Sequence, residues 1–308
     1  MKILIETPTW LGDAIMITPA IENLTNFFNE PKITLIGSSV SINVLKNNPL
    51  VIQTHLISKN YISLYKIIKG FDEFDIFITF RGSFRSRFLK FFISSKSKFQ
   101  FNKHIYKKGH QVEKYNNFIN HSLQTSSFAS NLIIHRKKKD KNGEKKILGL
   151  NPGASYGSSK RWYPKEFADV ALALSSDYDI VIFGGYGEQD IAADIEKYLN
   201  EYGVQNYQNL AAKTSIDELV SHISSLDLFI TGDSGPMHLA AAFQIPTVTI
   251  FGSTNHKETS QWMNDNGVFV RTSLACQPCM KRICPLKHHN CMKLLKAEVV
   301  LKAVQGLN

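Results

Sequence analysis

Apolar runs alternate with amphipathic stretches along the second half of the chain. The apolar runs predict strands at Ile147–Leu150, Ile180–Phe183, Asp227–Thr231 and Thr247–Phe251. The stretches that separate them predict helices at Lys165–Ser176, Asp190–Tyr202 and Ser215–Ser225. Strands that alternate with helices are typical of a parallel sheet with helices on both of its faces.

Two of these helices carry further signals. Apolar residues recur on one face of the first helix, at Phe167, Val170, Ala171 and Leu174. The third helix begins after Ser215, which is followed three residues later by Glu218, the pattern of a capping box.

The first half of the chain has the same alternation in a weaker form. Apolar runs predict strands at Lys2–Ile5, Ile33–Gly37 and Ile76–Phe80. A helix is predicted after the first of them, with Ala14, Ile17, Ile21, Leu24 and Phe28 on one face. We therefore expect an α/β protein built from two Rossmann-like domains with parallel sheets.

A polar and charged run, His135–Lys146, separates the two halves. The chain of 308 residues is long for one hydrophobic core, since domains of about 150 residues are usual. We place the N-terminal domain at residues 1–140 and the C-terminal domain at residues 141–308, joined by this run. A solvated hinge explains the positive charge of the run.

A polar turn follows the strand Asp227–Thr231, at the edge where open α/β sheets bind their ligands. The turn contains Asp233, Ser234 and Gly235, and Pro236 then starts a helix. Backbone N–H groups at a helix N-terminus favour a phosphate. An ordinary structural turn explains the same residues.

A second polar turn follows the first strand and ends in Gly12 and Asp13. Asp13 therefore lies at the ligand edge of the first predicted sheet, at the start of a helix. Asp is also a preferred N-cap residue, so a capping role needs no chemistry.

Two further loops lie at strand ends of the second domain. The loop Asn151–Pro164 contains Gly153 and Ser155, whose small size lets the backbone approach a ligand, and Lys160, which supplies charge to a phosphate without a metal. The loop after Ile180–Phe183 ends in Glu188, which can accept hydrogen bonds from a ribose. Together with the turn at 232–235, these loops predict a nucleotide site.

The net charge of +10 is concentrated in two segments. Residues 81–114 hold ten basic residues and Glu113, a net charge of +9, and residues 136–146 hold seven basic residues, Asp140 and Glu144, a net charge of +5. The remainder of the chain is therefore at −4. Such local basicity indicates one anionic partner. Arg81 and Arg85 lie at the ligand edge of the first domain and are the candidates to bind it.

The same basic segment also contains Phe84, Phe88, Phe91 and Phe92. Basic residues interleaved with aromatic ones can bind nucleic acid. The four phenylalanines recur at helical spacing, however, which is more typical of packing against a sheet. We therefore expect no nucleic-acid partner.

Nothing in the sequence predicts a membrane span. No apolar stretch approaches the roughly eighteen residues that a span requires. Lys2 and Glu6 interrupt the first apolar run too early for a secretory signal. We therefore expect a cytoplasmic protein.

Three motifs, in this order and spacing, are similar to those of the ADP-heptose:lipopolysaccharide heptosyltransferases of glycosyltransferase family 9. They are Gly12-Asp13, Asn151-Pro152-Gly153-Ala154 with Lys160-Arg161-Trp162, and Asp233-Ser234-Gly235-Pro236-Met237-His238. The Lys-Arg-Trp segment and the tail from Cys284 to Met292 resemble the heptosyltransferase II branch of this family. The resemblance covers nearly the whole chain and implies a GT-B fold of two facing Rossmann-like domains, with a final helix near Leu295–Gln305 that returns to the first domain.

The resemblance implies an inverting transfer of heptose from ADP-L-glycero-D-manno-heptose to the heptosylated Kdo-lipid A inner core of lipopolysaccharide. Asp13 would be the base for the acceptor hydroxyl, and Lys160 would stabilise the leaving diphosphate. Donor contacts are implied for Gly153, Ser155, Lys160, Glu188, Asp233, Ser234, Gly235 and His238, and acceptor contacts for Gly12, Asp13, Arg81 and Arg85. His238 also fits a core histidine on an apolar helix.

An acceptor carried on lipid A implies peripheral contact with the anionic inner face of the inner membrane. We expect the protein to act there as a monomer. Another GT-B enzyme acting on a nucleotide sugar, either an epimerase or a different glycosyltransferase, is the alternative function.

We expect no cofactor and no catalytic metal. Asp177-Tyr178-Asp179 has the spelling of a metal-binding motif, but it precedes a strand and so falls at the amino end of the sheet, away from ligands.

All four cysteines lie within sixteen residues, at Cys276, Cys279, Cys284 and Cys291, close to His288 and His289. Reduced structural thiols and a structural zinc both fit this cluster.

Overall fold

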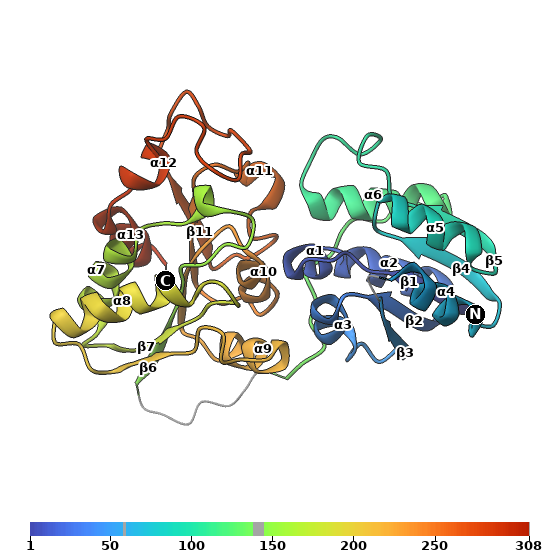
Figure 1. The fold of residues 1–308 in the computed structure, drawn as a ribbon, viewed down its shortest axis with the longest axis horizontal. Helices are drawn as coiled ribbons and strands as arrows, with labels where there is room; N and C mark the ends of the chain where they lie inside the picture. Colours follow the sequence, from blue (N-terminus) through green and yellow to red (C-terminus); the bar gives the residue numbers. More distant parts are fainter. Residues whose placement is uncertain (58–59, 138–144, 308) are drawn as a thin grey trace. The chain divides into compact units, whose positions relative to one another are not determined.

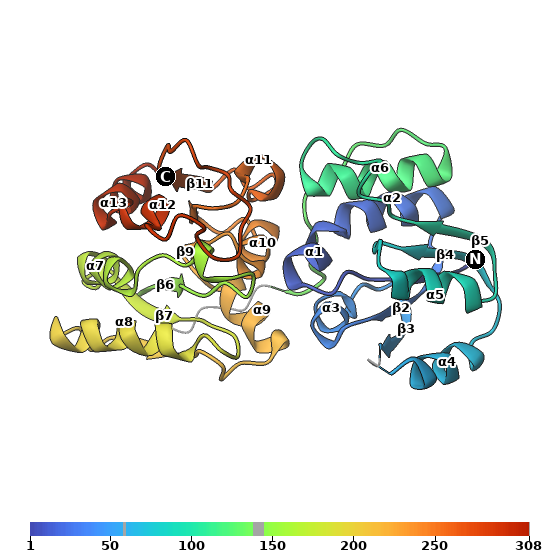
Figure 2. The same ribbon diagram turned by 45° about the horizontal axis from the view of Figure 1, so that its top comes forward.

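The structure is a computed structural model that describes residues 1–57, 60–137 and 145–307. The chain divides into two compact units, the first formed by Met1–Arg136 and the second beginning at Lys137 (Figures 1 and 2). The predicted domain boundary after residue 140 falls in the segment 138–144, which lies outside the described residues.

The first unit contains a parallel sheet of five strands in the order β3-β2-β1-β4-β5. The strands are β1 (Lys2–Glu6), β2 (Lys32–Gly37), β3 (Val51–Leu56), β4 (Phe74–Thr79) and β5 (Ser95–Gln100). The three strands predicted from the sequence, β1, β2 and β4, form its centre. They are buried along most of their length, whereas β3 and β5 at the edges are mostly exposed or half-buried.

The helices of the first unit form two groups (Figure 2). They are α1 (Leu11–Met16), α2 (Thr18–Phe28), α3 (Ser39–Leu45), α4 (Tyr61–Lys69), α5 (Phe84–Phe92) and α6 (Gln111–Leu123). In one group α1 contacts α3 and α6, and α2 contacts α6. In the other, α4 and α5 pack together over the sheet face that presents Leu4, Ile36 and Phe77.

The helix predicted after β1 is divided in two. Ile17 is the C-cap of α1 and the N-cap of α2. Pro19 lies in the first turn of α2, where its missing N–H costs no intrahelical hydrogen bond. The predicted buried positions Ala14, Ile17 and Ile21 are buried as expected.

The phenylalanines of α5 do not all pack inward, so that expectation is wrong for three of the four. Phe88 packs against the core, while Phe84, Phe91 and Phe92 are exposed. The space against the sheet is filled instead by Leu89 of the same helix, together with apolar residues of α4.

The second unit contains a parallel sheet of six strands in the order β11-β10-β9-β6-β7-β8. The strands are β6 (Lys146–Asn151), β7 (Tyr178–Ile182), β8 (Tyr207–Asn209), β9 (Leu228–Gly232), β10 (Thr247–Phe251) and β11 (Gly267–Arg271). The four predicted strands are β6, β7, β9 and β10, which are the interior strands of this sheet.

The helical elements of the second unit are η1 (Ser158–Lys160), α7 (Pro164–Leu174), α8 (Gln189–Glu201), α9 (Ile216–Ser224), α10 (Gly235–Ala242), α11 (His256–Thr259), α12 (Asn290–Lys293) and α13 (Ala297–Gln305). The predicted capping box of α9 is confirmed, because Ser215 and Glu218 each bond the backbone N–H of the other. The final helix α13 packs against α7, β10 and β11 of its own unit. Its expected return to the first unit stays a prediction.

A buried tryptophan joins the C-terminal segment to the loop after β6. Trp162 is 2% exposed, and its indole N–H donates to the Leu295 carbonyl at 2.9 Å.

Within residues 1–57, 60–137 and 145–307, no helix is both long enough and apolar enough to cross a membrane.

A buried carboxylate ends β1. Glu6 is fully buried and accepts hydrogen bonds from the hydroxyls of Thr79 at 2.6 Å and Ser86 at 3.0 Å. Arg81 Nη1 lies 3.4 Å from Glu6 Oε1. Burial raises the pKa of Glu6, although both hydroxyls and the nearby arginines act in the opposite direction.

Glu6→Gln tests the cost of this carboxylate. With a raised pKa, the folded protein takes up the Glu6 proton more readily than the unfolded chain does. The contribution of Glu6 to stability is therefore complete below its ordinary pKa of 4.5 and is lost as the pH rises through the raised value. We expect the free energy of urea unfolding of the wild type to fall, relative to Glu6→Gln, as the pH rises toward neutrality. Glu201→Gln, at the exposed end of α8, is the control. A difference between wild type and Glu6→Gln that does not change with pH would contradict the raised pKa.

Candidate active site

In each sheet the first strand in the chain lies in the interior. The strands that follow it are added first on one side of it and then on the other. In the first unit β1 lies between β2 and β4, and in the second unit β6 lies between β7 and β9. Open α/β sheets bind their ligands at the carboxyl ends of the strands where this reversal occurs. The loops after β1, β4, β6, β7 and β9 carry the predicted site residues.

In the second unit an ion pair joins the loop after β6 to the turn after β9. Lys160 Nζ lies 2.7 Å from Asp233 Oδ2 and also donates to the Asp233 carbonyl at 3.1 Å. Both side chains are largely buried, with 13% and 5% exposed. The Thr254 hydroxyl donates to the same carboxylate oxygen at 2.6 Å. Two predicted donor-binding residues are thus in direct contact, and a cation is held at the carboxyl ends of two neighbouring strands.

Side-chain hydrogen bonds fix the turn after β9. Asn151 and Thr231 are paired across β6 and β9, and Asn151 Nδ2 donates to the hydroxyls of Thr231 at 3.2 Å and Ser234 at 3.1 Å. Ser234 occupies the N-cap position of α10, but its side chain makes no capping bond. A simple cap therefore does not account for Ser234. Gly235 begins α10, and His238 is buried on the same helix.

Glu188 lies against the loop after β6. It is 7% exposed, and its Oε2 accepts a hydrogen bond from the Gly185 N–H at 2.7 Å. A Cβ on Gly153 would overlap the Glu188 carboxylate, so a larger residue at position 153 would displace that carboxylate from its present place. Ser155, in the same loop, is exposed. The structure thus brings Gly153 and Glu188 together at the ends of β6 and β7.

A cavity of about 350 Å³ opens at the carboxyl ends of β10 and β11. It is lined by Thr254, which also bonds Asp233, and by His256, Lys257 and Arg271. Burial, followed by the charges of Arg271 and Lys257, lowers the pKa of His256, so its ring is neutral at pH 7. This cavity was not predicted from the sequence. The basic residue that ends β11, Arg271, is the signal that could have indicated it.

In the first unit Asp13 is the third residue of α1. The N-cap of this helix is Trp10, so the proposal that Asp13 caps it is wrong. The hydroxyl of Tyr115, on α6, donates to Asp13 Oδ1 at 3.0 Å. Burial and then the Asp13 carboxylate hold the pKa of Tyr115 well above its ordinary value, so the phenol stays protonated. Gly12, the preceding residue, is half-buried. Tyr115 was not predicted as a site residue, because it lies 102 residues from Asp13 along the chain and no local pattern links the two.

Arg81 and Arg85 both lie near the buried carboxylate of Glu6. The guanidinium group of Arg85 stands over the Tyr61 ring, 5.7 Å from its centroid. Its Nε and Nη2 atoms are buried and have no hydrogen-bond partner among the described residues. Buried guanidinium N–H groups are costly without acceptors. Guanidinium groups pair well with the oxygen atoms of carboxylates and phosphates.

Asp177 and Asp179 are exposed at the start of β7, at the amino end of the sheet as predicted. In the part of the chain that the structure describes, no three His, Cys, Asp or Glu side chains are arranged to hold a metal ion. That the reaction needs no metal stays a prediction.

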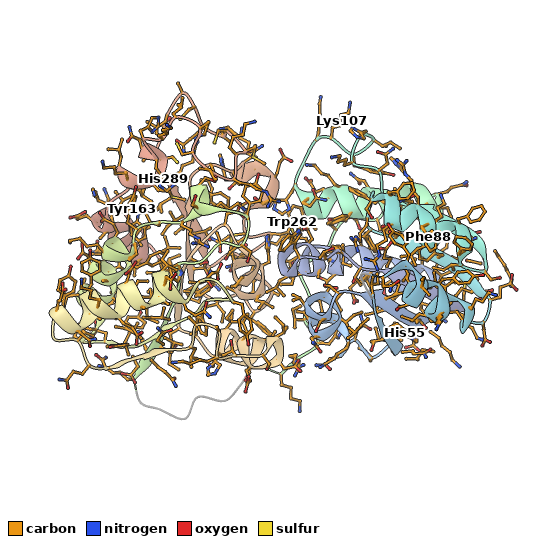
Figure 3. All side chains as sticks on the ribbon, viewed as in Figure 1. His55, Phe88, Lys107, Tyr163, Trp262 and His289 are labelled. Carbon is orange, nitrogen blue, oxygen red and sulfur yellow. The ribbon has the colours of Figure 1, made fainter. Side chains whose placement is uncertain are left out.

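The four cysteines are free thiols that line one small cavity together with His288 and His289. The side chain of His289 packs beside Tyr163 at the start of α7, with their ring centroids 5.8 Å apart (Figure 3). Burial, and then the neighbouring cysteines, raise the pKa of the Cys291 thiol to about 11. Cys291 is therefore protonated at neutral pH.

The sequence of this chain is similar to those of known proteins. The sequence model of glycosyltransferase family 9 (heptosyltransferase) matches residues 63–290. The chain is 43% identical over 317 residues to lipooligosaccharide heptosyltransferase 2 of Campylobacter jejuni subsp. jejuni serotype O:2. The alignment covers 100% of this chain and 98% of that protein. A 113-residue part, 36% of this chain and 32% of the relative, is 34% identical to lipopolysaccharide heptosyltransferase 2 of Escherichia coli K12.

Two solved structures are similar over nearly the whole chain. The structure of E. coli ADP-heptose lps heptosyltransferase II has a TM-score of 0.81 at 21% identity, covering 100% of this chain and 98% of that one. A family 9 glycosyltransferase from Veillonella parvula has a TM-score of 0.82 at 20% identity, covering 99% and 96%. These structures establish the fold, which is GT-B. Because the family model matches more than half of the residues and a relative 43% identical matches the full length, this chain belongs to glycosyltransferase family 9, the heptosyltransferases.

Proposed function

We propose that the protein transfers heptose, with inversion, from ADP-L-glycero-D-manno-heptose to the heptosylated Kdo-lipid A inner core of lipopolysaccharide. The observation that carries this proposal is the Lys160–Asp233 pair at the carboxyl ends of β6 and β9. A diphosphate oxygen can replace the Asp233 carboxylate as the partner of Lys160, because both are anionic oxygen acceptors. The identity of the transferred sugar is inferred from the relatives, which are named heptosyltransferases.

The second unit would bind the donor. Lys160 and the backbone N–H groups of Ser234 and Gly235 would stabilise the negative charge that develops on the diphosphate as the glycosidic bond breaks. Further donor contacts are proposed for Gly153, Ser155, Asp233 and His238, and Glu188 would accept hydrogen bonds from the ribose. The cations beside the 350 Å³ cavity, Lys257 and Arg271, add to the positive potential there.

The first unit would bind the acceptor. Asp13 would accept the proton of the attacking hydroxyl, which adds to the anomeric carbon while ADP leaves from the opposite face. The hydrogen bond from Tyr115 fixes one Asp13 oxygen at 3.0 Å and so orients the carboxylate. Gly12 lies beside it, and Arg81 and Arg85 would bind the phosphates or acidic sugars of the inner core. We place this reaction in the cytoplasm, at the inner face of the inner membrane, with the protein as a monomer.

The reaction is tested by incubating the protein with ADP-heptose, with and without the inner-core acceptor. We expect ADP to be released only when the acceptor is present, together with an acceptor heavier by one heptose, as measured by mass spectrometry. Conversion of the sugar nucleotide in the absence of acceptor would instead support an epimerase.

Asp13→Asn tests the base. This change keeps the shape of the side chain and a hydrogen-bond acceptor for Tyr115 but removes the proton acceptor, so we expect the transfer rate to fall at least ~100-fold while ADP affinity is unchanged. Asp190→Asn, in the exposed first turn of α8, is the matched control and should leave the rate unchanged. Near-normal turnover by Asp13→Asn would exclude Asp13 as the base.

Lys160→Gln tests the diphosphate contact. Glutamine can still donate to Asp233 but carries no charge, so we expect kcat/KM for the donor to fall about 100-fold and ADP binding, measured by calorimetry, to weaken. Lys165→Gln replaces an exposed lysine whose ion pair with Asp169 lies on α7, and it should have no effect.

EDTA should leave the wild type active. Complete loss of activity on chelation, reversed by Mg²⁺, would contradict the metal-free reaction.

A further inference from the structure

An apolar surface is exposed on α4 and α5 of the first unit. Its members, which we call the α4–α5 face, are Tyr61 (44% exposed), Ile62 (69%), Phe84 (76%), Phe91 (78%) and Phe92 (42%). Large apolar side chains that are exposed singly are normal in a soluble protein, but contiguous ones mark interaction sites. Of these five, Tyr61 lies under the guanidinium group of the proposed acceptor residue Arg85, and the other four have no role in the proposed reaction.

Three members of the α4–α5 face, Tyr61, Phe91 and Phe92, are joined through Phe88. Phe84 precedes Phe88 by one helical turn on α5, and Ile62 follows Tyr61 on α4. Ring contacts connect the two helices, with centroid distances of 5.2 Å for Tyr61–Phe88, 4.5 Å for Phe88–Phe92 and 5.0 Å for Phe91–Phe92. Phe88, the ring at the centre of this chain of contacts, is labelled on α5 in Figure 3. The opposite sides of both helices are anchored in the core through Leu64 and Leu89. The exposed rings are therefore supported from below.

Positive charge surrounds these rings. Lys66 and Lys69 lie in the last turn of α4, and α5 carries Arg87 and Lys90. Neither helix contains an aspartate or a glutamate. Aromatic and aliphatic side chains bordered by cations are typical of surfaces that bind at the boundary between the headgroups and acyl chains of an anionic bilayer.

We propose that the α4–α5 face docks the protein on an anionic lipid bilayer, with its exposed rings at the headgroup boundary and the surrounding cations against lipid phosphates. This inference rests on the proposed function, in which the acceptor is carried on a lipid. A second copy of this chain fits the face poorly, because two copies related by symmetry would bring like charges together. Since α5 begins three residues after Arg81, docking through its rings places the ligand edge of the first unit next to the membrane that carries the acceptor.

Vesicle co-sedimentation with the full-length protein tests the docking. We expect the wild type to bind vesicles of phosphatidylcholine and phosphatidylglycerol at low salt, and to bind vesicles of phosphatidylcholine alone much more weakly. Phe84→Ser/Phe91→Ser should reduce binding to the anionic vesicles about tenfold, because binding scales with the apolar area that enters the boundary. Phe128→Ser removes a phenylalanine that is 94% exposed elsewhere in the same unit and should bind like the wild type.

Equal binding by the wild type and the double variant, or no binding by the wild type, would contradict the proposal. A wild-type dimer in analytical ultracentrifugation that the double variant loses would assign the face to a second copy instead.

Activity on an acyl-free, water-soluble acceptor separates this inference from the proposed function. The double variant should keep wild-type kinetics on that acceptor and show a raised KM only for the acceptor in vesicles. If the wild type fails to glycosylate the soluble acceptor, the proposed function is wrong, whatever the vesicles show.

Discussion

The parallel pairing of the first strand of each unit with two neighbours is the constraint on which the rest of the structure depends. β1 and β6 are the first strands of their sheets, and later strands pair with both of their edges. The carboxyl ends of β1 and β6 therefore lie where the order of strands changes direction. The following loops are thereby brought together although they are far apart in sequence, as with Lys160 and Asp233, which are 73 residues apart. Open α/β sheets bind their ligands at that edge, and the core beneath it supplies rigidity.

Two largely buried ion pairs mark the two edges, Lys160 with Asp233 and Arg81 with Glu6. A buried ion pair loses the hydration of both groups, so its contribution to stability is small or negative. A role in function accounts better for their presence. We propose that each pair holds a cation in a fixed direction before an anion arrives, which would reduce the rearrangement needed when a phosphate binds. The hydroxyls of Thr254 and Thr79 hold the two carboxylates in place.

The sequence predicted every strand that has a neighbour on both sides and missed β3, β5, β8 and β11, which are the four edge strands. An interior strand is buried on both faces and is therefore continuously apolar, whereas an edge strand such as Ser95–Gln100 is largely polar and resembles a loop. The motifs located Asp13, Lys160 and Asp233. The partners that position the acidic residues, Tyr115 and Thr254, depend on tertiary contacts that leave no local pattern.

We propose that Lys160 exchanges Asp233 for a phosphate when the donor binds. A crystal structure of the protein with ADP measures this directly. We expect the diphosphate at the carboxyl ends of β6 and β9, with Lys160 Nζ at about 2.7–3.2 Å from one of its oxygens. ADP bound away from this edge, or Lys160 still bonded to Asp233 alone, would contradict the account.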